Sequence, residues 1–283
     1  MNAAELNSAA ARPRPSAIRR VALAVSDAVL PQTCAVCGTW IPSGGSRACD
    51  GCLASFEAIL WRSYCHRCAR TIRPESLDHR GCFRCRNERI WNIAGIARAG
   101  PYMHPLSTLI VGLKYGGRER NAAYLAELMA EALCGRSWLA DVEALVPVPM
   151  HWRRRMQRSC NHALLLTQEL ARRLEIPLLR CIRRARYAPS QMRFDAVSKA
   201  KLFKNVKGCF ALSRLAGLGW RSVRGRTVCI VDNIVRSGAT IHEVSKVLRK
   251  AGAKRIYAAI AARTVVPGDM QAKIGAMPAD VPP

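Results

Sequence analysis

Strand-length apolar runs alternate with helical segments between residues 92 and 262. Short runs of β-branched and small apolar residues predict strands over 92–99, 142–148, 178–182, 227–231 and 255–262. Apolar residues at helical spacing predict helices over 105–113, 122–133, 162–174 and 240–251. Such alternation predicts an α/β fold with a mostly parallel sheet and helices on both faces.

The remaining segments lack this alternation. Residues 183–208 are polar and basic, which predicts a long loop. The apolar run over 21–30 is short and contains Asp27, so we interpret it as a docked amphipathic helix rather than a signal peptide. No stretch approaches the ~18 apolar residues of a membrane span. These patterns favour a cytoplasmic protein without a transmembrane segment.

Eight of the 13 cysteines form four CxxC pairs, separated by 11, 12 and 13 residues. The pairs are Cys34/Cys37, Cys49/Cys52, Cys65/Cys68 and Cys82/Cys85. One CxxC presents two thiolates on a tight turn, and two such turns complete a tetrahedral zinc site. The spacing therefore predicts a double zinc ribbon that holds two structural Zn²⁺ ions.

Two other interpretations of these cysteines fit the pattern less well. A disulfide framework needs an oxidising compartment, and no export signal is evident. Iron–sulfur ligation usually draws on less regular spacing. The short gaps favour two sequential zinc sites, one from the first four cysteines and one from the last four. An interleaved pairing is left open by the sequence.

The candidate chemistry lies where the predicted strand over 227–231 leads into the predicted helix over 240–251. Asp232 and Asn233 follow the strand, at the edge where open α/β sheets bind ligands. Gly238 allows a phosphate to approach the backbone at the helix N-terminus. Thr240 and Glu243 have the spacing of a capping box. The segment is therefore a candidate phosphate loop.

This segment resembles the phosphoribosyl pyrophosphate (PRPP) motif of type I phosphoribosyltransferases. Two acidic residues in that motif contact the ribose, and a Thr-Thr-Gly-x-Thr loop holds the 5-phosphate. By resemblance, Asp232 and Asn233 are the catalytic pair. The phosphate-binding residues are Arg236, Ser237, Gly238, Ala239 and Thr240.

The segment departs from the motif at two positions. Asn233 replaces the second acid, so it keeps hydrogen bonding to a hydroxyl but lacks the charge that favours a cationic sugar. Arg236 replaces the first threonine, and a guanidinium binds phosphate well. The resemblance implies PRPP, or another ribose-phosphate, as ligand, with Mg²⁺ accompanying PRPP.

The ribbons and the domain that follows resemble the ComF (competence protein F) family over about residues 30–265. Matching segments include the Leu-Lys-Tyr at 113–115, the Val-Pro-Val-Pro at 146–149 and parts of 158–163 and 205–210. By resemblance, Lys114, Pro149 and Arg158 lie on the pyrophosphate side of the site. The resemblance implies a type I phosphoribosyltransferase fold and a link to DNA uptake in natural transformation.

The charge of the chain indicates a polyanionic partner. The formal net charge is +26, and ten arginines lie between Arg153 and Arg186 with only two acids among them. Such density suits single-stranded DNA, or a complex with DNA-processing proteins. Trp152 and Tyr187 lie among these arginines and could stack on bases, although core packing is the favoured role for Trp152. The alternative to an enzyme is therefore a non-catalytic, nucleic-acid-associated zinc-ribbon scaffold.

These observations predict four parts of the chain. Residues 1–30 form a tail and a short amphipathic helix, 31–88 the double zinc ribbon, 89–265 the phosphoribosyltransferase-like domain, and 266–283 a second tail.

Overall fold

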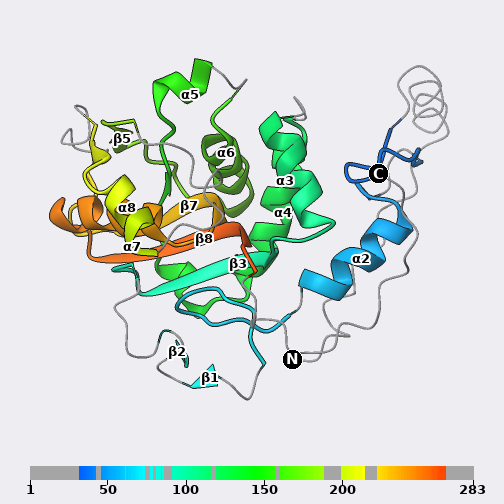
Figure 1. Ribbon diagram of the computed structural model, residues 1–283, viewed down its shortest axis with the longest axis horizontal. Helices are drawn as coiled ribbons and strands as arrows, with labels where there is room; N and C mark the ends of the chain where they lie inside the picture. Colours follow the sequence, from blue (N-terminus) through cyan, green and yellow to red (C-terminus); the bar gives the residue numbers. More distant parts are fainter. Residues whose placement is uncertain are drawn as a thin grey trace. The chain divides into compact units, whose positions relative to one another are not determined.

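Figure 1 shows the computed structural model of the chain. The structure describes residues 32–42, 46–60, 62–73, 77–78, 81–83, 85, 91–115, 119–156, 160–187, 199–213 and 222–265. Both expected tails, the expected helix over 21–30 and Arg158 lie outside these ranges. The chain divides into two compact units, residues 1–53 and 54–283.

The larger unit is built on a four-stranded, fully parallel sheet (Figure 1). The strands are β3 (Gly95–Pro101), β4 (Ala144–Pro147), β7 (Thr227–Val235) and β8 (Arg255–Arg263), in the order β3-β8-β7-β4. Their residues are almost all buried, as expected for parallel strands that are covered on both faces. This sheet confirms the predicted α/β fold. In the strand order, β7 is an interior strand between β8 and β4.

Four helices pack against this sheet. They are α3 (Leu106–Tyr115), α4 (Asn121–Cys134), α6 (His162–Leu174) and α8 (Ala239–Lys250). α4 packs on β3, β8 and α6, and α6 also packs on β4 and β7. α8 contributes Ile241, Val244 and Leu248 to a core that includes Val228 and Ile230 of β7. Each of these helices lies within two residues of its predicted bounds.

Sequence and structure differ in the segment that was expected to be one long loop. It contains α7 (Lys199–Val206), and Arg183 and Arg184 belong to β5 (Ile182–Arg184), which pairs with β6 (Phe210–Leu212) in an antiparallel ribbon. α7 forms because Leu202 and Val206, four residues apart, are both buried on one face. The expected strand over 178–182 is replaced by one parallel bridge between Leu145 and Leu178, and its last residue, Ile182, begins β5.

The structure describes five further elements. They are α2 (Asp50–Leu60), β1 (Leu77–Asp78), β2 (Gly81–Cys82), the 3₁₀ turn η3 (Ser137–Asp141) and α5 (Trp152–Met156). Within the described residues, no helix is both long enough and apolar enough to span a membrane.

Candidate functional site

The first cysteine cluster lies in the N-terminal unit. Cys34, Cys37, Cys49 and Cys52 place their Sγ atoms within 4.8 Å of one another. The Sγ atoms of Cys37 and Cys49 are 3.6 Å apart, near the ~3.8 Å that tetrahedral Zn–S bonds impose. Hydrogen bonding with Thr39 lowers the pKa of Cys37 to about 6, so the thiolate that binds a metal is favoured.

The second cluster, in the larger unit, has four buried cysteines: Cys65, Cys68, Cys82 and Cys85. Sγ distances are 3.5 Å for Cys65 and Cys85 and 3.7 Å for Cys68 and Cys82. The backbone N–H of Cys82 donates to Sγ of Cys65 at 3.3 Å, which stabilises a thiolate there.

Both clusters group sequential CxxC pairs, and all 13 cysteines are free of disulfides. The four-thiolate donor sets fit structural zinc. The structure therefore supports the sequential arrangement and contradicts a disulfide framework.

The candidate phosphate loop connects β7 to α8. Strand β7 continues to Val235, so Asp232 and Asn233 lie within the last four residues of the strand rather than after it. Gly238 then adopts φ +81° as the N-cap of α8. Ser237, only 9% exposed, accepts a hydrogen bond at Oγ from the N–H of Ala239, at 3.2 Å. The loop thus presents the backbone of a helix N-terminus beside a side-chain hydroxyl.

The expected capping box is wrong. The helix begins two residues earlier than that motif requires, so Thr240 lies in the first turn and Gly238 is the N-cap. Glu243 instead accepts the N–H of Gly208 at 2.9 Å and pairs with Lys246 at 3.2 Å. That carboxylate therefore ties the end of α7 to α8.

Asp232 is the acid at the carboxyl end of β7. Burial raises its pKa to about 6 from an ordinary 3.8, against the lowering effects of the Asn233 N–H and of the charges on Lys114 and Arg184. The N–H of Asn233 donates to Oδ1 of Asp232 at 2.8 Å, and Oδ1 of Asn233 accepts the N–H of Ile234 at 2.8 Å. The fold thus brings two cations from α3 and β5 near one carboxyl group.

Trp91 packs directly on the candidate phosphate loop, a role that no sequence pattern indicates. A Cβ placed on Gly238 would lie 1.8 Å from Cε2 of the Trp91 indole. The hydroxyl of Ser245 in α8 donates to the Trp91 carbonyl, and Arg249 donates to the Asn92 carbonyl at 3.1 Å. Gly238 is therefore required both by its positive φ and by this contact.

Arg263, at the end of β8, also contacts Trp91. Its guanidinium carbon lies 5.3 Å from the centroid of the Trp91 ring, and Nη1 donates to the Arg236 carbonyl. Only 2% of Arg263 is exposed. A buried cation and a buried indole thus hold the backbone that enters the loop.

The residues expected on the pyrophosphate side are only partly described. Lys114 lies in the last turn of α3, and its charge acts on Asp232. Pro149 follows β4, where the N–H of Val148 donates to the Val231 carbonyl at 3.0 Å and aligns the two strand ends. Lys114 therefore acts on the candidate site through its charge, and Pro149 follows the strand adjacent to β7.

An aromatic and basic surface follows Pro149. Trp152 is 59% exposed and Tyr187 is 41% exposed, which contradicts the expected core role of Trp152. The guanidinium carbon of Arg153 lies 5.4 Å from the Trp152 ring and 5.9 Å from the Tyr187 ring. The buried His151 ring lies against both, with centroids 5.6 Å and 5.3 Å away.

Comparison with known families assigns both parts of the chain. A "Double zinc ribbon domain" model matches residues 25–86, and a "Phosphoribosyl transferase domain" model matches residues 161–270. The purine phosphoribosyltransferase of Pyrococcus horikoshii aligns over 56% of this chain and 95% of its own, at 14% identity and a TM-score of 0.30. The fold assignment rests on the family models and the sheet order, because that score is low.

Two curated relatives extend over most of the chain. Competence protein F of Haemophilus influenzae is 29% identical over 212 residues, covering 74% of this chain and 86% of the relative. DNA utilization protein YhgH of Salmonella typhimurium is 30% identical over 220 residues, covering 76% of this chain and 90% of the relative. Since these relatives cover about three quarters of the chain and the family models match both the ribbons and the transferase domain, the chain belongs to the ComF (competence protein F) family.

Proposed function

We propose that the loop between β7 and α8 binds PRPP and that the domain transfers its phosphoribosyl group. The observation that carries this proposal is the position of Asp232. It lies in the last four residues of an interior parallel strand, where the charges of Lys114 and Arg184 act on it, and six positions before the left-handed Gly238. Ligands of open α/β sheets bind at such an edge.

The loop supplies the donors that a 5-phosphate needs. Backbone N–H groups at the start of α8 and the Ser237 and Thr240 hydroxyls would surround the phosphate, and the helix dipole favours its charge. The Arg236 guanidinium adds a charged donor where the common motif has a threonine. Phosphate binding is therefore expected to be stronger than ribose recognition at this site.

Asp232 and Asn233 have different tasks in this proposal. In transfer, the bond from the anomeric carbon to pyrophosphate breaks, and a bond to an acceptor nucleophile forms on the opposite face. The carboxylate of Asp232 would favour the cationic sugar between these events, and Asn233 would bind a ribose hydroxyl. The leaving pyrophosphate would lie toward Lys114 and Pro149.

The oxygen donors at this edge also fit Mg²⁺, which is held in proteins by one or two carboxylates together with substrate phosphates. Asp232 supplies a carboxylate with two oxygens, one of which accepts the N–H of Asn233, whereas the single side-chain oxygen of Asn233 already accepts the N–H of Ile234. When bound with PRPP, Mg²⁺ neutralises charge on the pyrophosphate. In this chain Asp232 is therefore the residue that would hold it.

Calorimetric titration of PRPP with Mg²⁺ into the zinc-loaded chain tests the proposal. Saturable binding that Asp232→Ala weakens at least tenfold is expected, since one charged contact is lost. Asp141→Ala is the matched control, because Asp141 lies 57% exposed in η3, before β4 rather than after a strand. Absence of PRPP binding at millimolar ligand would refute the proposal, and equal affinity for ribose 5-phosphate would point to another ribose-phosphate.

We further propose that the surface of Trp152, Arg153 and Tyr187 contacts single-stranded DNA, alongside the phosphate site rather than in place of it. Exposed aromatic rings next to a cation provide stacking for bases and charge for the backbone. Several relatives are named DNA utilization proteins, which agrees with such a ligand. DNA-processing proteins could share the same surface.

Fluorescence anisotropy with a deoxythymidine strand of about 20 nucleotides, and with an abasic strand of equal length, separates stacking from charge. We expect the double variant Trp152→Ala/Tyr187→Ala to lose about tenfold in affinity for the first strand and nothing for the second. Trp40→Ala is the control, because Trp40 is 61% exposed in the N-terminal unit. Equal affinity of the wild type for both strands would exclude stacking.

A further inference from the structure

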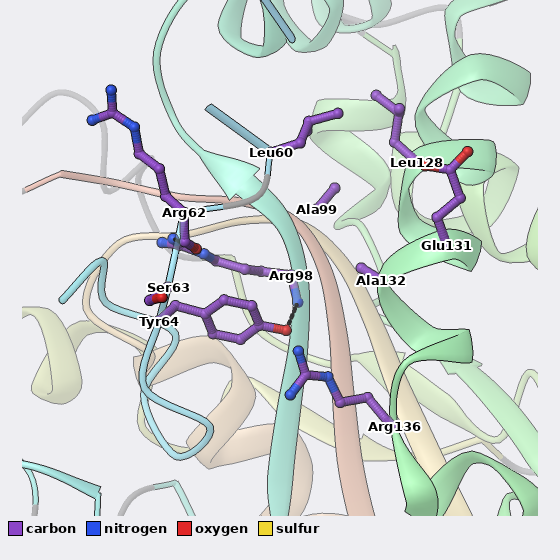
Figure 2. Close-up of a pocket in the computed structure, with 10 residues that line it drawn as sticks. All are labelled: Leu60, Arg62, Ser63, Tyr64, Arg98, Ala99, Leu128, Glu131, Ala132 and Arg136. Carbon is purple, nitrogen blue, oxygen red and sulfur yellow. Dashed lines mark hydrogen bonds between the residues drawn. The ribbon is translucent and has the colours of Figure 1, made fainter. Parts of the chain in front are cut away.

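A cavity of about 400 Å³ lies at the outer edge of the sheet, along β3 (Figure 2). Its walls come from the end of α2, the segment that follows it, β3, α4, and Arg136 between α4 and η3. β8 lies between β3 and β7 in the sheet, so the cavity is separate from the candidate phosphate loop. Nothing in the proposed transfer reaction uses this cavity.

The cavity has a polar end built around one ring. The Tyr64 ring contacts two guanidinium groups. The guanidinium carbon of Arg98 lies 4.7 Å from the ring centroid, and that of Arg136 lies 4.9 Å from it. The Tyr64 hydroxyl accepts the backbone N–H of Arg98 at 3.2 Å, so its own proton is directed elsewhere. Figure 2 shows the hydroxyl and the Arg136 guanidinium close together.

The hydrogen-bond donors of Arg98 and Arg136 differ in how many acceptors they have. Arg98 is 2% exposed and donates from Nη1 to the Ala69 carbonyl at 2.7 Å, so it holds the second zinc ribbon against β3. Nε of Arg136 is buried, and it has no hydrogen-bond partner within the described part of the chain. A buried cationic donor normally has an acceptor, so an anion at this end of the cavity would complete it.

The opposite end of the cavity is mostly apolar, although the Glu131 carboxylate lies beside Leu128 there (Figure 2). Leu60, Leu128 and Ala132 line it, and Figure 2 shows Leu60 and Leu128 at the end away from Arg136. The Glu131 carboxylate is turned away from the Tyr64 hydroxyl in the same view. Arg62 also lines the cavity, but its Nε donates to the Ala58 carbonyl at 3.0 Å. One end therefore favours an anionic group and the other an apolar body.

We propose that this cavity is a second ligand site, which binds a small organic anion through Arg136 and Tyr64 and packs the apolar part of that molecule against Leu60 and Leu128. The anionic group is a carboxylate or a phosphate monoester, since both accept two hydrogen bonds from a guanidinium. A neutral molecule of the same shape leaves the Arg136 donor unsatisfied and binds poorly.

Calorimetry with phenyl phosphate, benzoate and benzyl alcohol tests the site in the full, zinc-loaded chain. We expect phenyl phosphate or benzoate to bind and the neutral alcohol to bind at least tenfold more weakly. The stronger of the two acids identifies the head group. No binding of either acid at millimolar concentration would overturn the proposal.

Variants distinguish this cavity from the phosphate loop. Arg136→Gln should weaken binding of the acid about tenfold, and Arg236→Gln, in the loop, should leave it unchanged. Ala132→Phe keeps every charge and fills the cavity, so it should abolish binding while zinc content and thermal unfolding stay near those of the wild type. Loss of binding in Arg236→Gln alone, or unaltered binding in Ala132→Phe, would assign the anion to another site and refute the proposal.

Discussion

At the scale of single residues, two constraints act together on Gly238 in the candidate site. Gly238 has both a positive φ and the indole of Trp91 in the space where a side chain would begin. Gly225 has a similar φ of +75°, but a Cβ there would meet nothing within 4 Å. A comparison of substitutions at the two glycines therefore distinguishes the cost of backbone strain from the cost of steric overlap with Trp91.

Replacement of each glycine by alanine should show this difference. Gly225→Ala is expected to lower the free energy of unfolding by about 1 kcal/mol, from the positive φ alone. Gly238→Ala should cost a further ~1–3 kcal/mol, because Trp91 must move, and PRPP affinity should fall with it. Denaturant unfolding of both variants measures the comparison, and equal losses would mean that the indole yields without cost.

The raised pKa of Asp232 predicts a dependence of stability on pH. Between about pH 4 and pH 6 the folded chain keeps a proton that the unfolded chain has released, so the free energy of unfolding falls as pH rises through this window. At pH 7.5, Asp232→Asn should be more stable than the wild type, by up to about 3 kcal/mol.

The difference between the two proteins should shrink toward about pH 5, where the wild-type carboxyl is mostly protonated. Measuring the difference at each pH removes any effect of pH on zinc binding that both proteins share. A difference that stays constant from pH 5 to 7.5 would contradict the raised pKa.

Among the elements, the two zinc clusters have separate ligand sets, so one should be removable without the other. Cys65→Ser is expected to reduce the zinc content from two ions per chain to about one, because three thiolates bind far more weakly than four. Cys181→Ser is the control, since Cys181 is equally buried and belongs to neither cluster. Elemental analysis of the purified variants gives the result, and loss of both ions would show that the clusters fold together.

The sequence predicted the elements whose pattern is local. The strand over 227–231 and the helices at α3, α4, α6 and α8 were identified because apolar periodicity and Gly252 are visible along the chain. α7 was missed because its two buried positions, Leu202 and Val206, are embedded among lysines. The short β5 and β6 depend on pairing between distant segments, which periodicity does not report.

The candidate site divides in the same way. Its cysteines and the loop residues could be found from spacing and motif, since each set is nearly contiguous. Trp91, Arg184 and Arg263 could not, because they come from distant segments that only folding brings near the loop or Asp232. Trp152 was misjudged because a tryptophan next to arginines has the same local sequence whether it is buried or exposed. The domain boundaries, the roles of the site residues and the cytoplasmic location stay predictions.

At the scale of the whole molecule, a formal net charge of +26 should govern encounters with DNA. Affinity for the deoxythymidine strand is expected to fall steeply with salt, with a slope of about −0.7 per neutralised phosphate in a log–log plot. Trp152→Ala/Tyr187→Ala should lower the affinity without changing that slope, because no charge is removed. Anisotropy titrations over a range of salt measure this, and a flat dependence would exclude an electrostatic DNA surface.

The contact between Trp91 and the phosphate loop also bears on how such a protein can be altered by recombination. Trp91 follows Cys85 by six positions, so the chain that leaves the second cysteine cluster is the same chain that supports the loop. A zinc module grafted from another protein would bring a different exit segment and leave Gly238 without its indole. The two modules are therefore expected to be inherited as a pair, and a functional chimera needs its junction placed before the second cluster or the Trp91 segment carried across with it.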